Sequence, residues 1–244
     1  MSNKSLIYAP RGRALEYSPL ACNLFTGCIH SCKYCFGPSL LHKKRREYEA
    51  GIQVKDDVVK RFEQDAKKFE GDPREILFSF FTDVYQTEES TKIMREVLEI
   101  CSKYKLRIQV LTKAGKNITD DDFEMFRKNN WKFGSTVCFM DEKLREEWEP
   151  GAPSIQSRID AIKFASQVGV FTWVSIEPVI NTQSALDVID ELKGYVDLWK
   201  VGKLNHFPEI EATIDWKQFL KDAMTKLNGE RTIFKKDLME FIIK

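Results

Sequence analysis

Three cysteines, Cys28, Cys32 and Cys35, lie within one short segment and are the clearest sign of chemistry in this sequence. Thiolate sulfur is a soft ligand that selects zinc or iron–sulfur clusters. A structural zinc site needs four ligands, so His30 or Cys22 would have to complete one. Ferredoxin-type clusters use four cysteines in spacings that this segment does not have. Three cysteines leave one iron of a four-iron cluster without a protein ligand, and a substrate can chelate that open iron.

The spacing of the three cysteines is C-x3-C-x2-C, and an aromatic residue, Tyr34, precedes the last one. Other segments accompany this motif in a fixed order between about Tyr17 and Asn181. They are Thr26-Gly27-Cys28, Ile52-Gln53-Val54-Lys55, Phe81-Thr82-Asp83-Val84-Tyr85-Gln86, Leu111-Thr112-Lys113 and Glu149-Pro150-Gly151-Ala152-Pro153-Ser154 with Arg158. Together they resemble the spore photoproduct lyase-like branch of the radical S-adenosylmethionine (SAM) superfamily.

The resemblance implies a [4Fe-4S] cluster on Cys28, Cys32 and Cys35, with SAM bound to the open iron through its amino and carboxylate groups. An electron from the cluster then breaks a sulfur–carbon bond of SAM and gives a 5′-deoxyadenosyl radical. The implied partners are a reductant such as flavodoxin or ferredoxin and an unidentified substrate. The protein's own task is to position the reactants and shield the radical, since the cofactor carries the hard chemistry.

The resemblance also implies roles for side chains near the ends of the predicted strands, where barrel enzymes gather their functional residues. Thr82 and Asp83 match the positions that meet the amino group of SAM, and Lys113 matches the lysine that meets its carboxylate. Ser135 matches a hydroxyl near the methionine or ribose part, with Thr136 the adjacent alternative. Tyr34 is expected near the adenosine. Two further candidates follow from position alone: Glu177, at a strand end, is expected to bind ribose hydroxyls or substrate, and Arg158 is expected to form a structural pair with Glu149 or another carboxylate.

The substrate is the least determined part of this interpretation. Photoproduct lyases that repair DNA carry a cysteine hydrogen donor where this chain has Phe81, so direct repair of photolesions is not favoured. The basic run at residues 43–46 and the resemblance favour a nucleic acid or nucleotide, although such a run is commonly a solvated surface. A peptide or small molecule stays open, and so does a zinc-stabilised binding module. We interpret Cys101 and Cys138 as buried apolar residues.

Composition fits a single domain, spanning residues 1–244. The chain has 244 residues, 43% of them hydrophobic, and a net charge of +1, which provides no global attraction for nucleic acid or an anionic membrane. Residues 1–17 do not resemble a signal peptide, and no apolar stretch approaches the roughly 20 residues that span a bilayer. We therefore expect a cytoplasmic monomer with no membrane contact.

Strand-length apolar runs alternate with helix-length amphipathic runs, which is typical of parallel β/α units. The expected strands are residues 20–27, 76–81, 107–111, 131–139, 170–176 and 196–201. The expected helices between them are residues 56–69, 88–103, 119–128, 154–168 and 182–193. This pattern predicts a partial TIM-type (β/α)6 barrel with a core at about 17–205, followed by a helical cap at about 206–244 with helices at 215–227 and 235–243.

Overall fold

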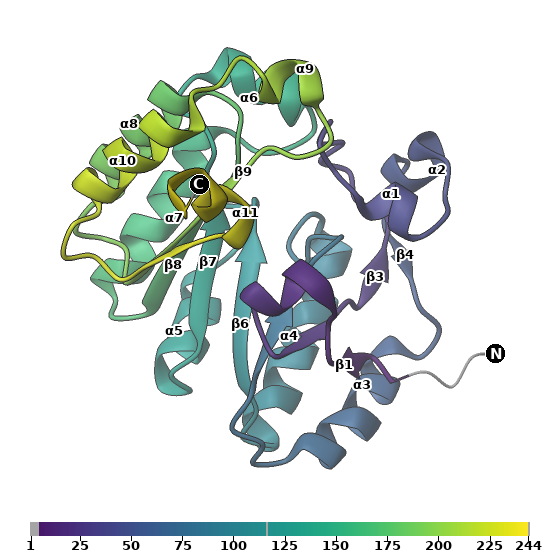
Figure 1. The fold of residues 1–244 in the computed structure, drawn as a ribbon. Coiled ribbons are helices and arrows are strands. Elements are labelled where there is room, and N and C mark those ends of the chain that lie inside the picture. Colours follow the sequence, from purple (N-terminus) through teal and green to yellow (C-terminus); the bar gives the residue numbers. More distant parts are fainter. Residues whose placement is uncertain (1–4, 116, 244) are drawn as a thin grey trace.

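The computed structural model describes residues 5–115 and 117–243, and one mostly parallel sheet forms its centre (Figure 1). The order of its strands is β1-β2-β5-β6-β7-β8-β9-β10, with all neighbours parallel except β1 and β2. The strands are β1 (Ile7–Tyr8), β2 (Leu20–Cys22), β5 (Glu75–Phe78), β6 (Arg107–Thr112), β7 (Lys132–Thr136), β8 (Phe171–Val179), β9 (Leu198–Lys203) and β10 (Thr232–Phe234). The runs of β2 and of β5 to β9 are mostly buried, as expected for the inner strands of a parallel sheet.

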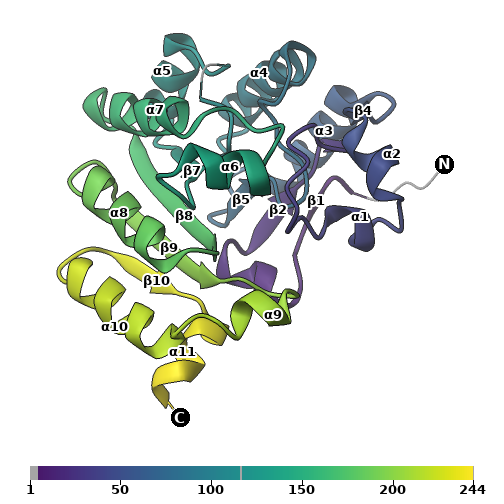
Figure 2. The same ribbon diagram turned by 90° about the horizontal axis from the view of Figure 1, so that it is seen from above.

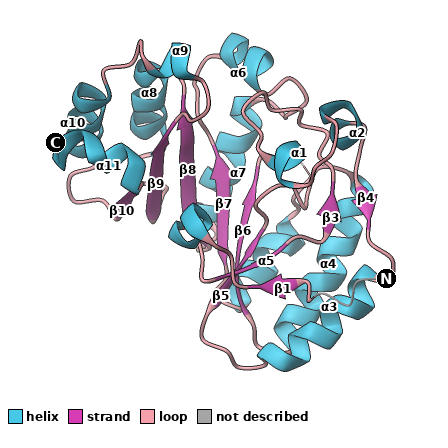
Figure 3. Cartoon of the chain, turned by 45° about the vertical axis from the view of Figure 1, so that its right-hand side comes forward, coloured by secondary structure: helices cyan, strands magenta, loops and turns pink. Residues whose placement is uncertain are grey.

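Helices cover the outer face of this curved sheet, and Figures 2 and 3 show them arranged around the strands. The longer ones are α3 (Val58–Ala66), α4 (Glu88–Lys103), α5 (Asp120–Lys128), α7 (Ile155–Gln167), α8 (Thr182–Leu192), α10 (Trp216–Lys226) and α11 (Lys236–Ile243). The shorter ones are α1 (Gly37–Leu40), α2 (Arg45–Glu49), α6 (Glu142–Trp148) and α9 (Pro208–Glu211), with 3-10 turns η1 (Gly12–Glu16) and η2 (Lys67–Phe69). No helix in the described residues is long and apolar enough to cross a membrane.

The predicted architecture is confirmed: the fold is an α/β partial barrel whose sheet does not close. The first expected strand divides at Asn23 into β2 and β3 (Phe25–Thr26), and β3 pairs with β4 (Gln53–Val54) instead of the main sheet. The Asn23 side chain accepts a hydrogen bond from the amide of Phe80 and donates one to the Tyr8 hydroxyl, which fixes the interruption.

The C-terminal region is more than a helical cap, because β10 extends the sheet along β9. The sequence pattern does not predict this three-residue strand. Its residues are half-buried or exposed, so they lack the continuous apolar pattern of a buried strand. The two helices expected on either side of it are present as α10 and α11.

The open side of the barrel is bridged by η1, the purple turn that lies close to α11 in Figure 1. Arg13 of η1 forms an ion pair with Asp237 and donates a hydrogen bond to Asn205 at 3.1 Å. The Glu16 carboxylate accepts from the amide of Lys236 at 3.1 Å. The segment between β1 and β2 therefore contacts the opposite end of the sheet.

Candidate active site

The three cysteines lie in the loop between β3 and α1, which we call the cysteine loop (residues 27–36). Its main chain is held from two sides. The amide of Cys28 donates to the carbonyl of Tyr48 at 3.0 Å, and the amide of Lys33 donates to the carbonyl of Trp148 at 2.8 Å. These contacts fix the loop between α2 and α6.

The three thiols are electrostatic neighbours in a largely buried setting. Burial raises the pKa of the Cys32 thiol to about 12, although Lys113 opposes this effect. Burial also raises the pKa of Cys28 well above its usual value, and Asp83, Cys32 and Cys35 add to the increase. Without a cation the thiols of Cys28 and Cys32 are neutral, and bound iron would convert them to thiolates.

The donor set fits an iron–sulfur cluster. The amide of Gly37 donates to the sulfur of Cys35 at 3.4 Å, a contact that suits a thiolate bound to iron. Within residues 5–115 and 117–243, no group of three or more histidine, cysteine or acidic side chains is arranged to hold a metal ion. A four-iron cluster needs no such arrangement, because each thiolate bonds a different iron atom.

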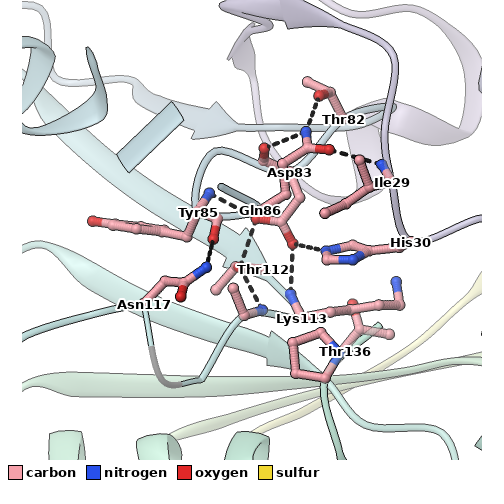
Figure 4. A network of polar contacts seen from close by, with 12 residues as sticks. Ile29, His30, Thr82, Asp83, Tyr85, Gln86, Thr112, Lys113, Asn117 and Thr136 are labelled. Carbon is pink, nitrogen blue, oxygen red and sulfur yellow. Dashed lines mark hydrogen bonds and ion pairs between the residues drawn. The ribbon is translucent and has the colours of Figure 1, made fainter. Parts of the chain in front are cut away.

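Asp83 lies just after β5 and accepts four hydrogen bonds, in a network that Figure 4 shows together with His30 and Lys113. One carboxylate oxygen accepts from the amide of Tyr85 at 2.9 Å and the Thr112 hydroxyl at 2.7 Å. The other accepts from the amide of Lys113 at 2.7 Å and pairs with Nε2 of His30 at 3.0 Å. Asp83 thus joins the ends of β5 and β6 to the cysteine loop.

The environment keeps Asp83 ionised. Burial alone would raise its pKa, but the hydrogen bond and charge of His30 and the amides of Lys113 and Tyr85 lower it to about 2. A carboxylate that accepts several hydrogen bonds is stabilised in its charged form. Asp83 is therefore a buried anion beside the thiols.

Gln86 makes a second link between β5 and the cysteine loop. Its side-chain oxygen accepts from the amide of Ile29 at 2.8 Å, and its nitrogen donates to the carbonyl of Asp83 at 2.8 Å and to the hydroxyl of Thr82 at 3.1 Å. The Thr82 hydroxyl in turn donates to the carbonyl of Gly27 at 2.9 Å. Thr82 is thus engaged with the loop that carries the cysteines.

Lys113 follows β6 and extends toward a buried carboxylate, Glu149. Its ammonium lies 3.9 Å from Glu149 and 5.6 Å from the centre of the Tyr34 ring. Burial by itself would lower the pKa of Lys113, but Cys32 and Glu149 raise it, so the ammonium stays charged. The Tyr34 hydroxyl donates to Glu149, so Tyr34 and Lys113 meet at one carboxylate.

Arg158 on α7 pairs with Glu149, as the sequence predicted. The guanidinium donates to Glu149 at 2.5 Å and to the carbonyls of Pro153 and Thr136, at 2.8 and 3.2 Å, and both charged side chains are fully buried.

Gly151 lets the segment between α6 and α7 approach the cysteine loop, because a Cβ atom there would stand 2.0 Å from the carbonyl oxygen of Ile29.

Ser135 and Thr136 lie on opposite faces of β7, since side chains alternate along a strand. The Ser135 hydroxyl donates to the carbonyl of Thr112, and its neighbours on that face, Phe133 and Val137, belong to the main core beneath the helices. Thr136 shares its face with Gly134, against which the Trp173 indole packs. Thr136, which the sequence offers as the alternative to Ser135, is drawn beside Lys113 in Figure 4.

Glu177 lies at a separate cluster inside the barrel, which we call the seam cluster: Tyr17, Glu177, Lys200 and Lys235. The Tyr17 hydroxyl donates to Glu177, and the ammonium of Lys235 is 3.8 Å from the same carboxylate. Burial raises the pKa of Glu177 despite Lys235. No hydrogen bond or ion pair of the described residues joins Glu177 to the Asp83 network.

Lys200 is a buried cation of the seam cluster. It lies within β9, buried, with its ammonium 4.1 Å from the centre of the Trp173 ring and 3.0 Å from the carbonyl of Tyr17. Cys101 and Cys138 are fully buried among core residues, which confirms that interpretation.

His30 and Gln86 carry much of the site, but the sequence analysis gave neither this role. In the sequence, His30 is a candidate only for a zinc ligand, and Gln86 only belongs to a segment that resembles the family. The signal that could have identified them is a polar residue inside a cysteine motif and another shortly after the Thr-Asp pair. Their partners are backbone amides and a distant carboxylate, which only the folded chain brings together.

Comparison with known proteins agrees with this geometry. The family model of the Radical SAM superfamily matches residues 22–193. The uncharacterised protein MJ0683 of Methanocaldococcus jannaschii is 26% identical over 226 residues, covering 90% of this chain and 83% of that protein.

Two solved structures have a similar fold at low sequence identity. A mutant of spore photoproduct lyase matches with a TM-score of 0.70 at 15% identity, covering 93% of this chain and 79% of that one. Streptococcus suis SuiB bound to S-adenosylmethionine matches with a TM-score of 0.63 at 14% identity, covering 90% of this chain. This chain spans about half the length of SuiB.

A family match over most of the chain, a partial barrel and a loop with three cysteines agree with one another. The superfamily implies SAM and an iron–sulfur cluster as cofactors. The chain is therefore an enzyme of the radical SAM superfamily.

Proposed function

We propose that this enzyme holds a [4Fe-4S] cluster on Cys28, Cys32 and Cys35 and reductively cleaves SAM. When bound, the cluster supplies the electron that releases a 5′-deoxyadenosyl radical, which abstracts hydrogen from the substrate. The observation that carries the proposal is the link between the cysteine loop and the ends of β5 and β6 through Asp83, which bonds both His30 and the amide of Lys113. A reductant such as flavodoxin or ferredoxin is the implied electron source.

We assign Lys113 to the carboxylate of SAM. Its ammonium is charged and buried, and its carboxylate partner, Glu149, is shared with Arg158 and Tyr34. A second carboxylate near Lys113 would find a charge-assisted partner there. Glu149 orients the ammonium and balances its charge before the cofactor arrives.

We assign Asp83 and Thr82 to the side of the amino group. The buried negative charge of Asp83 favours an ammonium nearby, while its hydrogen bonds fix the cysteine loop. Thr136 and Tyr34 are assigned to the methionine and adenosine side, and Ser135 is not, because its face of β7 packs into the core beneath the helices. Glu177 is assigned to substrate, because it is separate from the Asp83 network.

For the substrate we propose a nucleic acid or a nucleotide. One spore photoproduct lyase structure of the same fold is described as complexed with dinucleoside spore photoproduct, which supports this class. Another neighbour, SuiB, is described as bound to precursor peptide SuiA, so a peptide is the competing class. Phe81 stands in place of a cysteine beside the Thr-Asp pair, so the proposal does not include lesion repair.

The test is to reconstitute the protein anaerobically with iron and sulfide, reduce it with dithionite, add SAM and measure 5′-deoxyadenosine. We expect formation by the wild type and by the control Cys101→Ala, and none by Cys32→Ala. Nucleotides, oligonucleotides and peptides are then compared for stimulation of 5′-deoxyadenosine release. A fully iron-loaded protein that forms no 5′-deoxyadenosine would refute the proposal, and so would a colourless protein that holds one zinc and takes up no iron.

A further inference from the structure

The outer side of the cysteine loop carries a surface that the proposed chemistry does not use. We call it the basic patch and define it by five exposed side chains, Lys33, Phe36, Leu40, Lys44 and Arg46. Phe36 directly follows Cys35, and Leu40 ends α1. These two side chains are 51% and 55% exposed, and each of the three cations lies within six residues of one of them along the chain. Exposed apolar groups with a charged rim are typical of an interaction surface.

Charge is segregated onto this part of the chain. Residues 28–55 contain six basic and two acidic side chains, whereas the whole chain has a net charge of only +1. In the part of the chain that the structure describes, Lys44 and Arg46 form no ion pair, while Lys33 pairs with Glu147. The two unpaired cations are available to an acidic partner.

Arg45 connects the basic patch to the cluster ligands. Its guanidinium donates to the carbonyls of Cys32, Lys33 and Cys35, at 3.0, 2.9 and 3.3 Å, and to the carboxylate of Glu49. The backbone that presents Cys32 and Cys35 is therefore bonded directly to the helix that carries Arg46 and follows Lys44. A partner on the patch would lie close to the thiols.

The position of the patch separates it from the substrate side. In Figure 2, α1 and α2 lie at the periphery of the molecule, while Figure 4 shows Lys113 and Thr136 near His30 of the cysteine loop, at the ends of the central strands. A molecule on the patch meets the cysteine loop from outside and does not reach the barrel interior. The position of the basic patch therefore fits a molecule that gives an electron to the cluster, and it does not fit the substrate, which gives hydrogen to the radical inside the barrel.

We propose that the basic patch docks an acidic one-electron carrier of the flavodoxin or ferredoxin class, an inference that rests on the proposed function. The reduced carrier loses one electron, the cluster gains it, and no atom is transferred. Complementary charge steers such encounters and makes them sensitive to salt. The charges orient the carrier, and the exposed side chains of Phe36 and Leu40 provide apolar contact area for it.

The test compares Lys44→Glu/Arg46→Glu with Lys217→Glu/Lys221→Glu, which changes the net charge equally on exposed positions of α10. Binding of an acidic flavodoxin to each reconstituted protein is measured from flavin fluorescence at two salt concentrations. At about 50 mM salt we expect the patch variant to bind at least roughly tenfold more weakly and the control to change less than about twofold. At about 0.5 M salt the difference should largely disappear.

Dithionite bypasses the carrier and separates the two proposals. The patch variant should keep the wild-type iron content and dithionite-driven 5′-deoxyadenosine formation, and lose only the flavodoxin-driven reaction. Equal flavodoxin binding by all three proteins would overturn the docking site. Loss of affinity for a single-stranded oligonucleotide with unchanged flavodoxin binding would also overturn it and identify a nucleic-acid surface instead. A wild type inactive with dithionite would count against the proposed function alone.

Discussion

Asp83 is the side chain on which the hydrogen bonds of the site converge. It accepts from two backbone amides, a hydroxyl and a histidine, and each donor belongs to a different residue of the site. A matching residue in the family is expected to meet the amino group of SAM. The contacts in this chain give Asp83 a second task, because His30 belongs to the cysteine loop.

Replacing Asp83 by alanine should therefore reduce iron binding as well as SAM binding. The change leaves buried donors on Tyr85, Thr112 and Lys113 without a partner, and we expect the free energy of unfolding to fall by about 2–4 kcal/mol. Chemical denaturation and the iron-to-protein ratio after reconstitution measure the two effects. The exposed Asp121→Ala serves as control. A variant with normal iron content would mean that the link to His30 does not hold the loop.

Lys113→Met should weaken SAM binding without loss of iron. The variant removes the ammonium assigned to the cofactor carboxylate and leaves the hydrogen bond between the backbone of Lys113 and Asp83 intact. Loss of one charge-assisted contact of about 1.5–3 kcal/mol corresponds to roughly 10- to 150-fold weaker binding. Equilibrium dialysis with labelled SAM measures it. Lys33→Met, an exposed lysine of the cysteine loop, should bind SAM as the wild type does.

At the scale of elements, the segment between α6 and α7 clamps the cysteine loop. The Trp148 carbonyl accepts a hydrogen bond from the amide of Lys33, and the amide of Gly151 donates one to the carbonyl of His30. The Glu149 carboxylate accepts one from the Tyr34 hydroxyl. Arg158 anchors this segment to α7 and to the end of β7. Burial alone would raise the pKa of Glu149, but Arg158 and Lys113 lower it below its usual value. The ion pair therefore stabilises a junction of three elements.

A double-mutant cycle on Glu149 and Arg158 should show strong coupling. Arg158→Met leaves the Glu149 carboxylate buried with less compensation, and the expected loss of stability is about 3–5 kcal/mol. Adding Glu149→Gln should recover part of that loss, since the remaining charge is removed. Urea denaturation of the four proteins measures the coupling. Additive effects would indicate that the two side chains do not depend on each other.

The sequence predicted the elements better than the contacts between them. Strand β5 is apolar from Ile76 to Phe78, and α4 begins with a capping box at Thr87 and Ser90, so the local pattern was sufficient to predict both. β10 was missed because its burial is too weak to leave a pattern. The three cysteines were found from spacing. The pairing of His30 with Asp83 could not be predicted from the sequence. The two residues are 53 positions apart, and each side chain has another plausible role.

For the whole molecule, the barrel interior contains a buried cation whose charge state depends on pH. Burial, with repulsion from Lys235 and Lys132, lowers the pKa of Lys200 to about 7, while Glu75 and Glu177 oppose this. An unfolded lysine has a pKa near ~10.4. Between these values the unfolded chain binds a proton that the folded chain does not, so this group makes stability increase from about pH 7 to pH 10.

Lys200→Met should remove that dependence. We expect the variant to gain stability relative to wild type by about 3 kcal/mol near pH 6, and the advantage to shrink toward pH 10. Thermal or urea unfolding of both proteins from pH 6 to pH 10 gives the difference curve. Lys217→Met, on the surface of α10, should show no such trend. A difference between wild type and Lys200→Met that does not change with pH would contradict the assignment.

The bridge that η1 makes across the open side of the barrel has a consequence for the order of folding. Arg13 and Asp237 are 224 positions apart, whereas Arg45 reaches the carbonyl of Cys32 across 13. Contacts between distant segments form late, because the chain must first close a long loop. During synthesis the cysteine loop and Arg45 can come together well before β10 and α11 have been synthesised. We therefore expect the contact between η1 and α11 to form last, and iron and sulfide to have access to the thiols before it does.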